Sequence, residues 1–375
     1  MLKRKGLHGG GEILSKKSRP APSSPLFSLL FLPDLCDELI KFISGSTLRA
    51  LMSIGLCQCA IKSYVKLYGF PITGTFTLDT SLRGSINGNY LERQPPICIL
   101  PTAVHCKLGS TVAGPLRPAI VLPTAVIIKR GDSWAPLTYE SVIDGGISLG
   151  LGWLLLIKAS NHELLLTDID TGTRVVVKTA REHRIIGCAR LQELSPQGNV
   201  QFLLLRCNPV GNVSIIVCEF IEGVRDFEST SMPAYDELTG ATKIASGADA
   251  TYAIVPDPNL QPAARQRILF WGHPGGFAPP TRFNFVSAAD MLTSGVARGA
   301  QLVSIALSPG GNLFVLARSG ANTTIVVLAP DGTPLDSVDS TGFDGTAVDI
   351  CFIEGVLHLV SSTGLYTMEN ITDRS

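Results

Sequence analysis

The chain has 375 residues, of which 45% are hydrophobic and 17% are charged. Disordered chains combine low hydrophobicity with high net charge, so this composition excludes that class and predicts a folded protein of one large or two ordinary domains. The 31 basic residues balance the 31 acidic ones, so the charge provides no reason to expect a nucleic-acid partner.

Residues 1–24 are rich in Gly, Ser, Lys and Pro, which predicts a disordered tail. The tail carries two clusters of basic residues separated by ten others: Lys3, Arg4, Lys5 and Lys16, Lys17, Arg19. This spacing resembles a bipartite nuclear import signal, in which two cationic patches bind two acidic grooves of one carrier. A solvated basic tail is the alternative. We therefore expect the nucleus or the cytoplasm as the location.

The apolar run in residues 25–33 follows this basic segment, as the hydrophobic region of a signal peptide would. It is bounded by prolines, it is short even for a signal peptide, and it is far too short to cross a bilayer. We expect a soluble protein without a membrane partner.

Residues 33–68 show helical periodicity. A first apolar stripe recurs at steps of three and four residues, at Leu35, Leu39, Ile40 and Ile43. Asp34 is placed to cap this helix and Gly45 to end it, and a second helix follows with Leu48, Leu51, Met52 and Leu56. About 35 residues of helix cannot form a stable core alone, so this module must pack on a partner or on the rest of the chain.

From residue 71 to residue 375 the pattern changes to strands. Apolar runs of four to eight residues, such as GWLLLIKAS and VQFLLLRC, are bounded by Gly, Pro, Asn or Asp. Long amphipathic helical stretches do not separate these runs, which argues against alternating strands and helices in a parallel sheet.

These strands recur as a unit of about 40–60 residues, which is the signature of a β-propeller. This period predicts inner strands that start near Trp153, Phe202, Tyr252, Leu313 and Val356. The predicted fold is mainly β: a propeller of about six blades over residues 71–375, closed by the GLYTM strand pairing with an early strand. A pair of β-sandwiches is the alternative.

Three segments resemble blades of WD40-like and NHL-like propellers. LSPGGNLFVLARS (residues 307–319) resembles the turn that precedes the second strand of a blade. DIDTGTRVVV (168–177) and APDGTPLDSV (329–338) resemble hairpins between outer strands. The Trp-Asp dipeptide of true WD40 repeats is missing, so the resemblance rests on period and hairpin chemistry.

Residues 31–68, within a helical module assigned to 25–70, resemble an F-box. The residues near the motif's positions are Leu32, Pro33, Leu35, Leu39, Ile40, Ile43, Leu48, Leu51, Ile54 and Leu56. Two departures from the motif are a shorter first helix and Ala60 or Ile61 in place of the closing aromatic. A helical lid on the propeller is the alternative.

The F-box resemblance implies a substrate-recognition adaptor of an SCF-type cullin-RING ubiquitin ligase. The helical module would dock a Skp1-like adaptor, and the propeller would bind an unknown target protein. We expect a monomer within this larger complex. The competing classes are a stand-alone propeller scaffold for protein interactions and a propeller hydrolase.

Catalytic motifs do not favour an enzyme. Residues 146–150 match Gly-x-Ser-x-Gly, but a strand-like run follows where a nucleophile elbow needs a helix. Asp168 and Asp170 begin like a calcium loop, yet Thr179 stands where the twelfth-position glutamate belongs. The histidines lack metal-site spacing. We expect neither metal, cofactor nor catalytic residues.

Two further groups of residues can be explained by structure alone, without a functional role. Trp271, His273 and Arg282 could line a propeller mouth, although an ordinary loop explains them equally simply. The nine cysteines lack paired spacing, which predicts reduced and mostly buried thiols.

Overall fold

The structure is a computed structural model that describes residues 76–85, 90–103, 116–150, 152–159, 163–177, 183–195, 197–221, 226–247, 250–256, 266–272, 284–286, 300–308, 311–320, 322–328, 334–339 and 343–368. The basic tail and the F-box-like module, with every residue assigned to them above, lie outside these ranges.

The described residues form six four-stranded antiparallel sheets. The first sheet contains β2 (Cys98–Ala103), β3 (Leu116–Leu122), β4 (Ala125–Arg130) and β5 (Ser133–Thr138). The second contains β6 (Ile143–Gly150), β7 (Trp153–Lys158), β8 (Leu164–Asp168) and β9 (Arg174–Val177). The third contains β10 (Arg184–Leu194), β11 (Val200–Cys207), β12 (Val213–Ile221) and β13 (Asp226–Tyr235).

The other three sheets repeat this arrangement. The fourth contains β14 (Lys243–Ser246), β15 (Ala250–Pro256), β16 (Gln266–Gly272) and β17 (Asn284–Val286). The fifth contains β18 (Gln301–Leu307), β19 (Leu313–Ser319), β20 (Asn322–Leu328) and β21 (Pro334–Asp339). The sixth contains β22 (Ala347–Ile353), β23 (Val356–Ser361), β24 (Leu365–Met368) and, from the other end of the chain, β1 (Thr77–Leu78).

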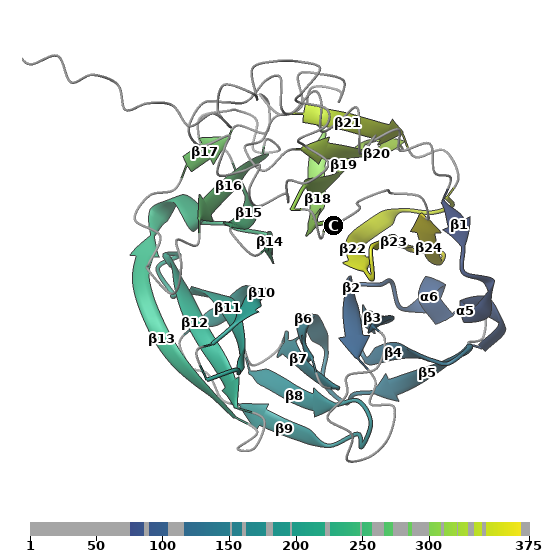
Figure 1. The fold of residues 1–375 in the computed structure, drawn as a ribbon, viewed down its shortest axis with the longest axis horizontal. Coiled ribbons are helices and arrows are strands. Elements are labelled where there is room, and N and C mark those ends of the chain that lie inside the picture. Colours follow the sequence, from purple (N-terminus) through teal and green to yellow (C-terminus); the bar gives the residue numbers. More distant parts are fainter. Residues whose placement is uncertain are drawn as a thin grey trace, which may run out of the picture.

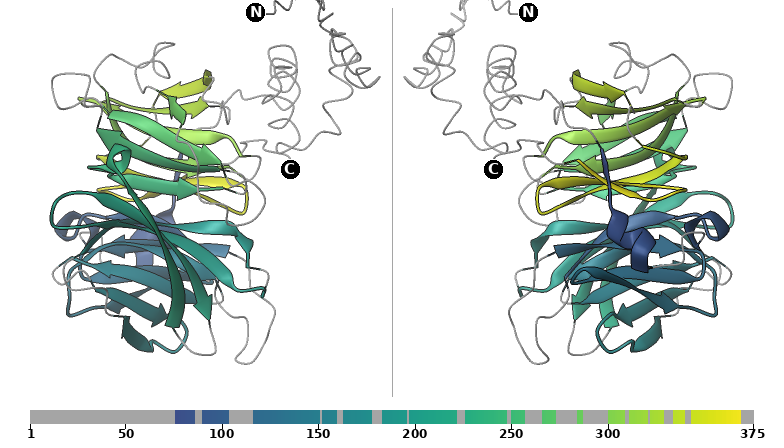
Figure 2. Two further views of the ribbon diagram at one scale, coloured as in Figure 1. Left: turned by 90° about the vertical axis from the view of Figure 1, so that its left-hand side faces the viewer. Right: turned by 90° about the vertical axis from the view of Figure 1, so that its right-hand side faces the viewer.

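The sheets are arranged radially around an axis (Figure 1). The first strands of successive sheets contact one another, and β22 of the sixth sheet contacts β2 of the first. This arrangement is a β-propeller, so the mainly-β propeller prediction is confirmed and the sandwich alternative is wrong. Figure 2 shows the ring from the rim, with β13 crossing one side and the short helices α5 (Thr80–Ser85) and α6 (Tyr90–Arg93) on the opposite side.

The predicted phase of the repeat is wrong by one strand. Trp153, Phe202, Tyr252, Leu313 and Val356 lie in or begin the second strand of their sheets, and the innermost strands precede them. Second strands are buried on both faces between neighbouring sheets, which makes them the most apolar runs. Some inner strands carry glycine or charged residues, as in IDGGISLG of β6 and KIAS of β14, so hydrophobicity identifies the inner strands less clearly.

Apolar layers between neighbouring sheets, which we call seams, form the core. At the seam of the second and third sheets, Leu155 and Leu166 pack with Phe202 and Leu204. Similar clusters fill most other seams. At the fifth and sixth sheets, the rings of Phe314 and Phe352 meet edge to face at 4.7 Å. Apolar burial contributes about 25 cal/mol per Å², so the seams supply most of the stability.

Three hairpins share one turn of the form Ser/Asn-Pro-x-Gly-Asn, at residues 195–199, 208–212 and 308–312. The side-chain oxygen of the first residue accepts the N–H of the fifth, at 3.1 Å from Ser195, 2.9 Å from Asn208 and 3.0 Å from Ser308. The fourth residue has φ of +82°, +100° and +85°, a region that glycine adopts without strain. The turn and second strand expected in residues 307–319 are confirmed.

The ends of the propeller meet in the sixth sheet. Thr77 of β1 pairs with Thr367 of β24, and Leu78 pairs with Tyr366. The expected pairing of the C-terminal GLYTM strand with an early strand is therefore confirmed. Residues 290 and 288 positions apart therefore share one ladder, which joins the two ends of the propeller within one sheet.

Candidate functional site

A carboxylate on the propeller axis joins four sheets. Asp349 of β22 is only 2% exposed. Its Oδ2 accepts the N–H of Ile99 from β2 at 2.9 Å, and its Oδ1 accepts from Lys243 Nζ of β14 at 2.7 Å and from the Ser304 hydroxyl of β18. We call Asp349, Lys243, Ser304 and the Ile99 N–H the axial cluster.

Irregularities in the inner strands precede these side chains. The register of β22 shifts between Ala347 and Asp349, and that of β18 shifts between Leu302 and Ser304. A β-bulge re-aims the side chains that follow it. Similar shifts in β6 and β10 are followed by Gly145 and Gly187, which place no side chain at the corresponding positions.

Lys243 carries the counter-charge. Burial alone would lower the pKa of its ammonium group, but the Asp349 carboxylate outweighs burial and the net pKa is raised. Protein surrounds Lys243, yet 27% of its side chain remains accessible to solvent. The pair is therefore a charged one, with water reaching the ammonium side.

Three thiols lie on the inner strands near this pair: Cys98 on β2, Cys188 on β10 and Cys351 on β22. Burial raises the pKa of Cys98 to about 12 and raises the pKa values of Cys188 and Cys351 further. Nucleophilic attack and metal ligation both require the thiolate, which is scarce at such values. Within the described ranges, groups of three or more His, Cys, Asp or Glu arranged for a metal ion do not occur.

The axial cluster is suited to holding sheets together rather than to acid–base chemistry. A general base needs an oxygen free to take a proton from substrate. Both Asp349 oxygens already accept hydrogen bonds from other sheets. The cluster therefore acts as a polar staple across the axis.

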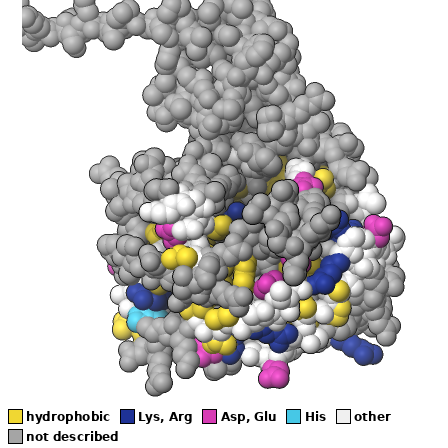
Figure 3. All heavy atoms as spheres, turned by 60° about the horizontal axis from the view of Figure 1, so that its bottom comes forward, with side chains coloured by type: hydrophobic (Ala, Val, Ile, Leu, Met, Phe, Trp, Pro, Cys, Tyr) yellow, Lys and Arg dark blue, Asp and Glu magenta, His cyan; other side chains and the backbone are white. Residues whose placement is uncertain are grey.

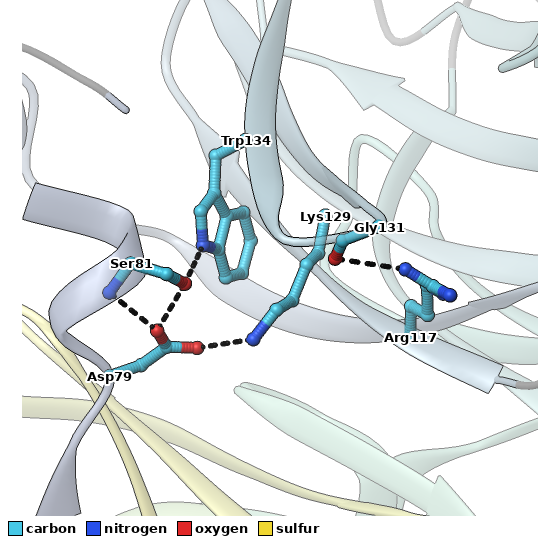
Figure 4. A network of polar contacts seen from close by, with 6 residues as sticks. All are labelled: Asp79, Ser81, Arg117, Lys129, Gly131 and Trp134. Atoms are coloured by element: carbon cyan, nitrogen blue, oxygen red, sulfur yellow. Dashed lines mark hydrogen bonds and ion pairs between the residues drawn. The ribbon is translucent and has the colours of Figure 1, made fainter. Parts of the chain in front are cut away.

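A second polar network, drawn in Figure 4, joins the first sheet to the sixth. Lys129 Nζ of β4 lies 2.7 Å from Asp79 Oδ2, and the Asp79 N–H donates to the Leu365 carbonyl at 2.8 Å. Asp79 Oδ1 accepts the Ser81 N–H at 3.0 Å, which caps α5, and Trp134 Nε1 of β5 donates to Ser81 Oγ at 3.0 Å. We call Asp79, Ser81, Lys129 and Trp134 the closure clamp.

Electrostatics support the closure clamp. Burial would raise the pKa of Asp79, but the hydrogen bonds from Lys129 and Ser81 and the Lys129 charge outweigh it, so the pKa is lowered. The Lys129 ammonium also lies 5.6 Å from the centre of the Trp134 ring, within cation–π range. The clamp locks β1 and α5, which follow directly on the N-terminal region.

The structure also places the weaker sequence candidates. Ser148 of the Gly-x-Ser-x-Gly string lies in β6, strand β7 follows, and no nucleophile elbow forms in this described segment. Asp168 Oδ1 accepts the Asp170 N–H at 2.9 Å in the β8–β9 turn, so the expected hairpin is confirmed. Trp271 lies within β16 and not in a loop, while His273 and Arg282 fall outside the described residues.

Sequence reasoning missed the axial cluster and the closure clamp. A signal was present: Asp349 stands inside the apolar run AVDICFI, and buried carboxylates are rare unless paired. Helix α5 was missed because its cap, Asp79, belongs to a segment that alternates like a strand, and α6 was missed because it has only four residues.

On the face shown in Figure 3, basic, acidic and apolar side chains of the described residues are interspersed, and neither charge dominates. This distribution agrees with the net charge of zero. None of the described helices has both the length and the hydropathy needed to cross a membrane.

No family model and no curated protein matches the chain. Solved structures that it resembles include the β-propeller domain of Cps50 (Swd1) from Myceliophteria thermophila (13% identity, 72% of this chain and 82% of that chain, TM-score 0.43). Others are the calcium-binding protein regucalcin from Agrobacterium tumefaciens strain C58 (11%, 74% and 92%, 0.49) and U3-55K (9%, 73% and 77%, 0.43). At these identities the similarity concerns the fold, and no function transfers.

Proposed function

We propose that this chain is the substrate-recognition adaptor of an SCF-type cullin-RING ubiquitin ligase. In this proposal the helical module at residues 25–70 docks a Skp1-like adaptor, and a propeller of six blades binds a target protein. Chemistry resides on other subunits, and this chain contributes proximity.

One structural observation carries the proposal: the segment that follows the helical module is built into the ring. Residues 71–75 separate the module from Phe76, and the next residues form β1 in the sixth sheet and α5 at the closure clamp. A partner held by the module is thereby tethered close to the propeller. The axial cluster favours a binding role over a catalytic one, because both oxygens of the Asp349 carboxylate already accept hydrogen bonds from other sheets.

The test replaces both Leu35 and Leu39 with Asp in the full-length chain and measures binding to a purified Skp1-like adaptor. Burying unpaired carboxylates costs several kcal/mol, so binding should be lost while thermal unfolding of the propeller stays unchanged. The matched control replaces Lys16 and Lys17 with Asp and should bind normally.

The alternative functions give different results in the same experiment. A helical lid on the propeller predicts no adaptor binding to lose and a large fall in melting temperature for the Leu35/Leu39 variant. A stand-alone scaffold predicts a stable wild-type chain that binds no Skp1-like adaptor. A propeller hydrolase has the weakest support, because the described axial thiols and carboxylate are poorly suited to attack.

For location, we propose that Lys3, Arg4, Lys5, Lys16, Lys17 and Arg19 act as a bipartite nuclear import signal. Deleting residues 1–24 should leave folding intact and shift the protein from the nucleus toward the cytoplasm. Fluorescence microscopy of tagged chains measures this, and an unchanged distribution would reject the signal.

A further inference from the structure

Arg190 of β10 is a half-buried cation whose guanidinium has no acceptor among the described residues. Six other arginines each have an oxygen partner: Arg117, Arg130, Arg174, Arg184, Arg206 and Arg318. Guanidinium presents five N–H donors in a planar fork, so an unpaired one in a half-buried place is unusual.

The guanidinium lies across the seam between the second and third sheets. A Cβ atom added to Gly150, at the end of β6, would stand 3.2 Å from Arg190 Nη1 and 3.5 Å from Nη2. Gly150 has φ of +82°, a conformation that favours glycine, and a Cβ there would require the end of the Arg190 side chain to shift by a few tenths of an ångström. The charged group therefore lies close to the backbone of the neighbouring sheet.

The surroundings beneath Arg190 are apolar. Its cross-strand neighbour in β11 is Phe202, and the partner of Gly150 in β7 is Trp153. Phe202 is fully buried and Trp153 is 5% exposed, both within the seam cluster. A charge beside such a layer is poorly screened and interacts strongly with an opposite charge.

Arg190 is separate from the axial cluster. Asp144 and Arg184 approach to 3.6 Å near the starts of β6 and β10, while Gly150 and Arg190 meet toward their ends, so the two strands run in the same direction. Lys243 is the first residue of its inner strand and Asp349 the third of its own. Arg190 therefore lies toward the opposite end of the inner strands.

We propose that Arg190, held over Gly150, is the anchor of an oxyanion-binding subsite at this seam, which takes a carboxylate or phosphate group. A planar guanidinium binds either group through two parallel N–H···O bonds. Burial lowers the pKa of Arg190, no charge among the described residues offsets this shift, and a bound oxyanion would supply a counter-charge. This subsite does not depend on the adaptor function.

The experiment follows the arginine Nε–Hε NMR signals of the full-length chain labelled with ¹⁵N-arginine. The Arg190 signal is identified as the one lost in Arg190→Gln. Three probes are titrated at constant ionic strength: sodium phosphate, sodium acetate, and a capped peptide with one glutamate. We expect saturable shifts of the Arg190 signal with a dissociation constant on the order of millimolar, as suits a single-residue anchor.

Two variants make the result specific. Arg318→Gln removes a partly exposed arginine that already donates to Gln301, and the Arg190 response should remain. Arg190→Lys keeps the positive charge but lacks the planar guanidinium, so phosphate binding, measured by calorimetry for this variant and the wild-type chain, should weaken several-fold. If Arg190→Gln does not fold, Arg190→Lys and the wild-type titration still decide.

The probes also distinguish the source of the oxyanion. Tighter binding of the peptide than of acetate indicates an acidic side chain of a partner protein. Phosphate binding without a peptide effect indicates a small free anion. An Arg190 signal that shifts linearly without saturation for all three probes, like that of Arg318, would overturn the proposal and leave Arg190 a hydrated surface charge.

Discussion

The Lys243 ammonium lies 2.7 Å from Asp349 Oδ1 although the two residues are 106 positions apart. Lys243 begins the inner strand of the fourth sheet and Asp349 belongs to that of the sixth, with Ser304 of the fifth sheet donating to the same oxygen. One carboxylate therefore links, through hydrogen bonds, sheets that are not neighbours in the ring.

Replacing Asp349 with Ala should destabilise the protein by about 2–4 kcal/mol, because it strands the Lys243 charge and the Ile99 N–H. Because solvent reaches Lys243, the loss of stability should be smaller than for a fully buried ion pair. Urea unfolding measures the change, and Asp132→Ala, at an exposed site, serves as the control.

The double variant Lys243→Met/Asp349→Leu should lose less stability than the sum of the two single variants, because neither charge is left alone. Additive losses in this double-mutant cycle would show that the two side chains do not interact.

The closure clamp predicts a local effect. Asp79→Ala removes the cap of α5 and the partner of Lys129, which should cost about 1–2 kcal/mol. Because Asp79 also follows directly on β1, amide hydrogen exchange should quicken in β1 and β24 more than in β11 or β12. Uniform acceleration across all sheets would contradict the clamp's assigned role.

His358, buried in β23, predicts acid sensitivity. Burial, and then the Lys129 charge, lower its pKa from 6.5 to about 4, with Asp79 opposing. The native state keeps it neutral while the unfolded chain takes up a proton, so its contribution is full above pH 6.5 and is lost as the pH falls toward 4. The loss reaches up to about 3 kcal/mol.

The variant His358→Gln tests this contribution. It should flatten the dependence of unfolding free energy on pH between 6.5 and 4 relative to the wild-type chain. Denaturation at several pH values measures both slopes, and equal slopes would assign the acid sensitivity to other groups.

The axial thiols should be unreactive in the folded protein. With the pKa of Cys98 raised to about 12, its thiolate fraction at pH 8 is about a thousandfold smaller than that of an ordinary cysteine in water. Alkylation of Cys98, Cys188 and Cys351, followed by peptide mass spectrometry, should be at least about a hundredfold slower in buffer than in urea. Rapid native labelling would place these thiols in an open, solvated channel.

Local sequence patterns predicted much of the scaffold. Four-to-eight-residue apolar runs between Gly, Pro, Asn and Asp define strands, since each strand's signal lies within its own residues. The turns at residues 168–172 and 308–312 were recognisable for the same reason, because their hydrogen bonds join residues within four positions. The roles of residues 1–70 remain predictions.

The tertiary structure alone decided which strand is innermost, which polar groups meet on the axis and which side chains clamp the closure of the ring. Asp349, Lys243 and Ile99 come from separate repeats, and Asp79 reaches Lys129 only after β1 has paired with β24. Periodicity describes the burial of each strand by itself. Contacts between repeats depend instead on how the sheets pack around one axis, which no local pattern encodes.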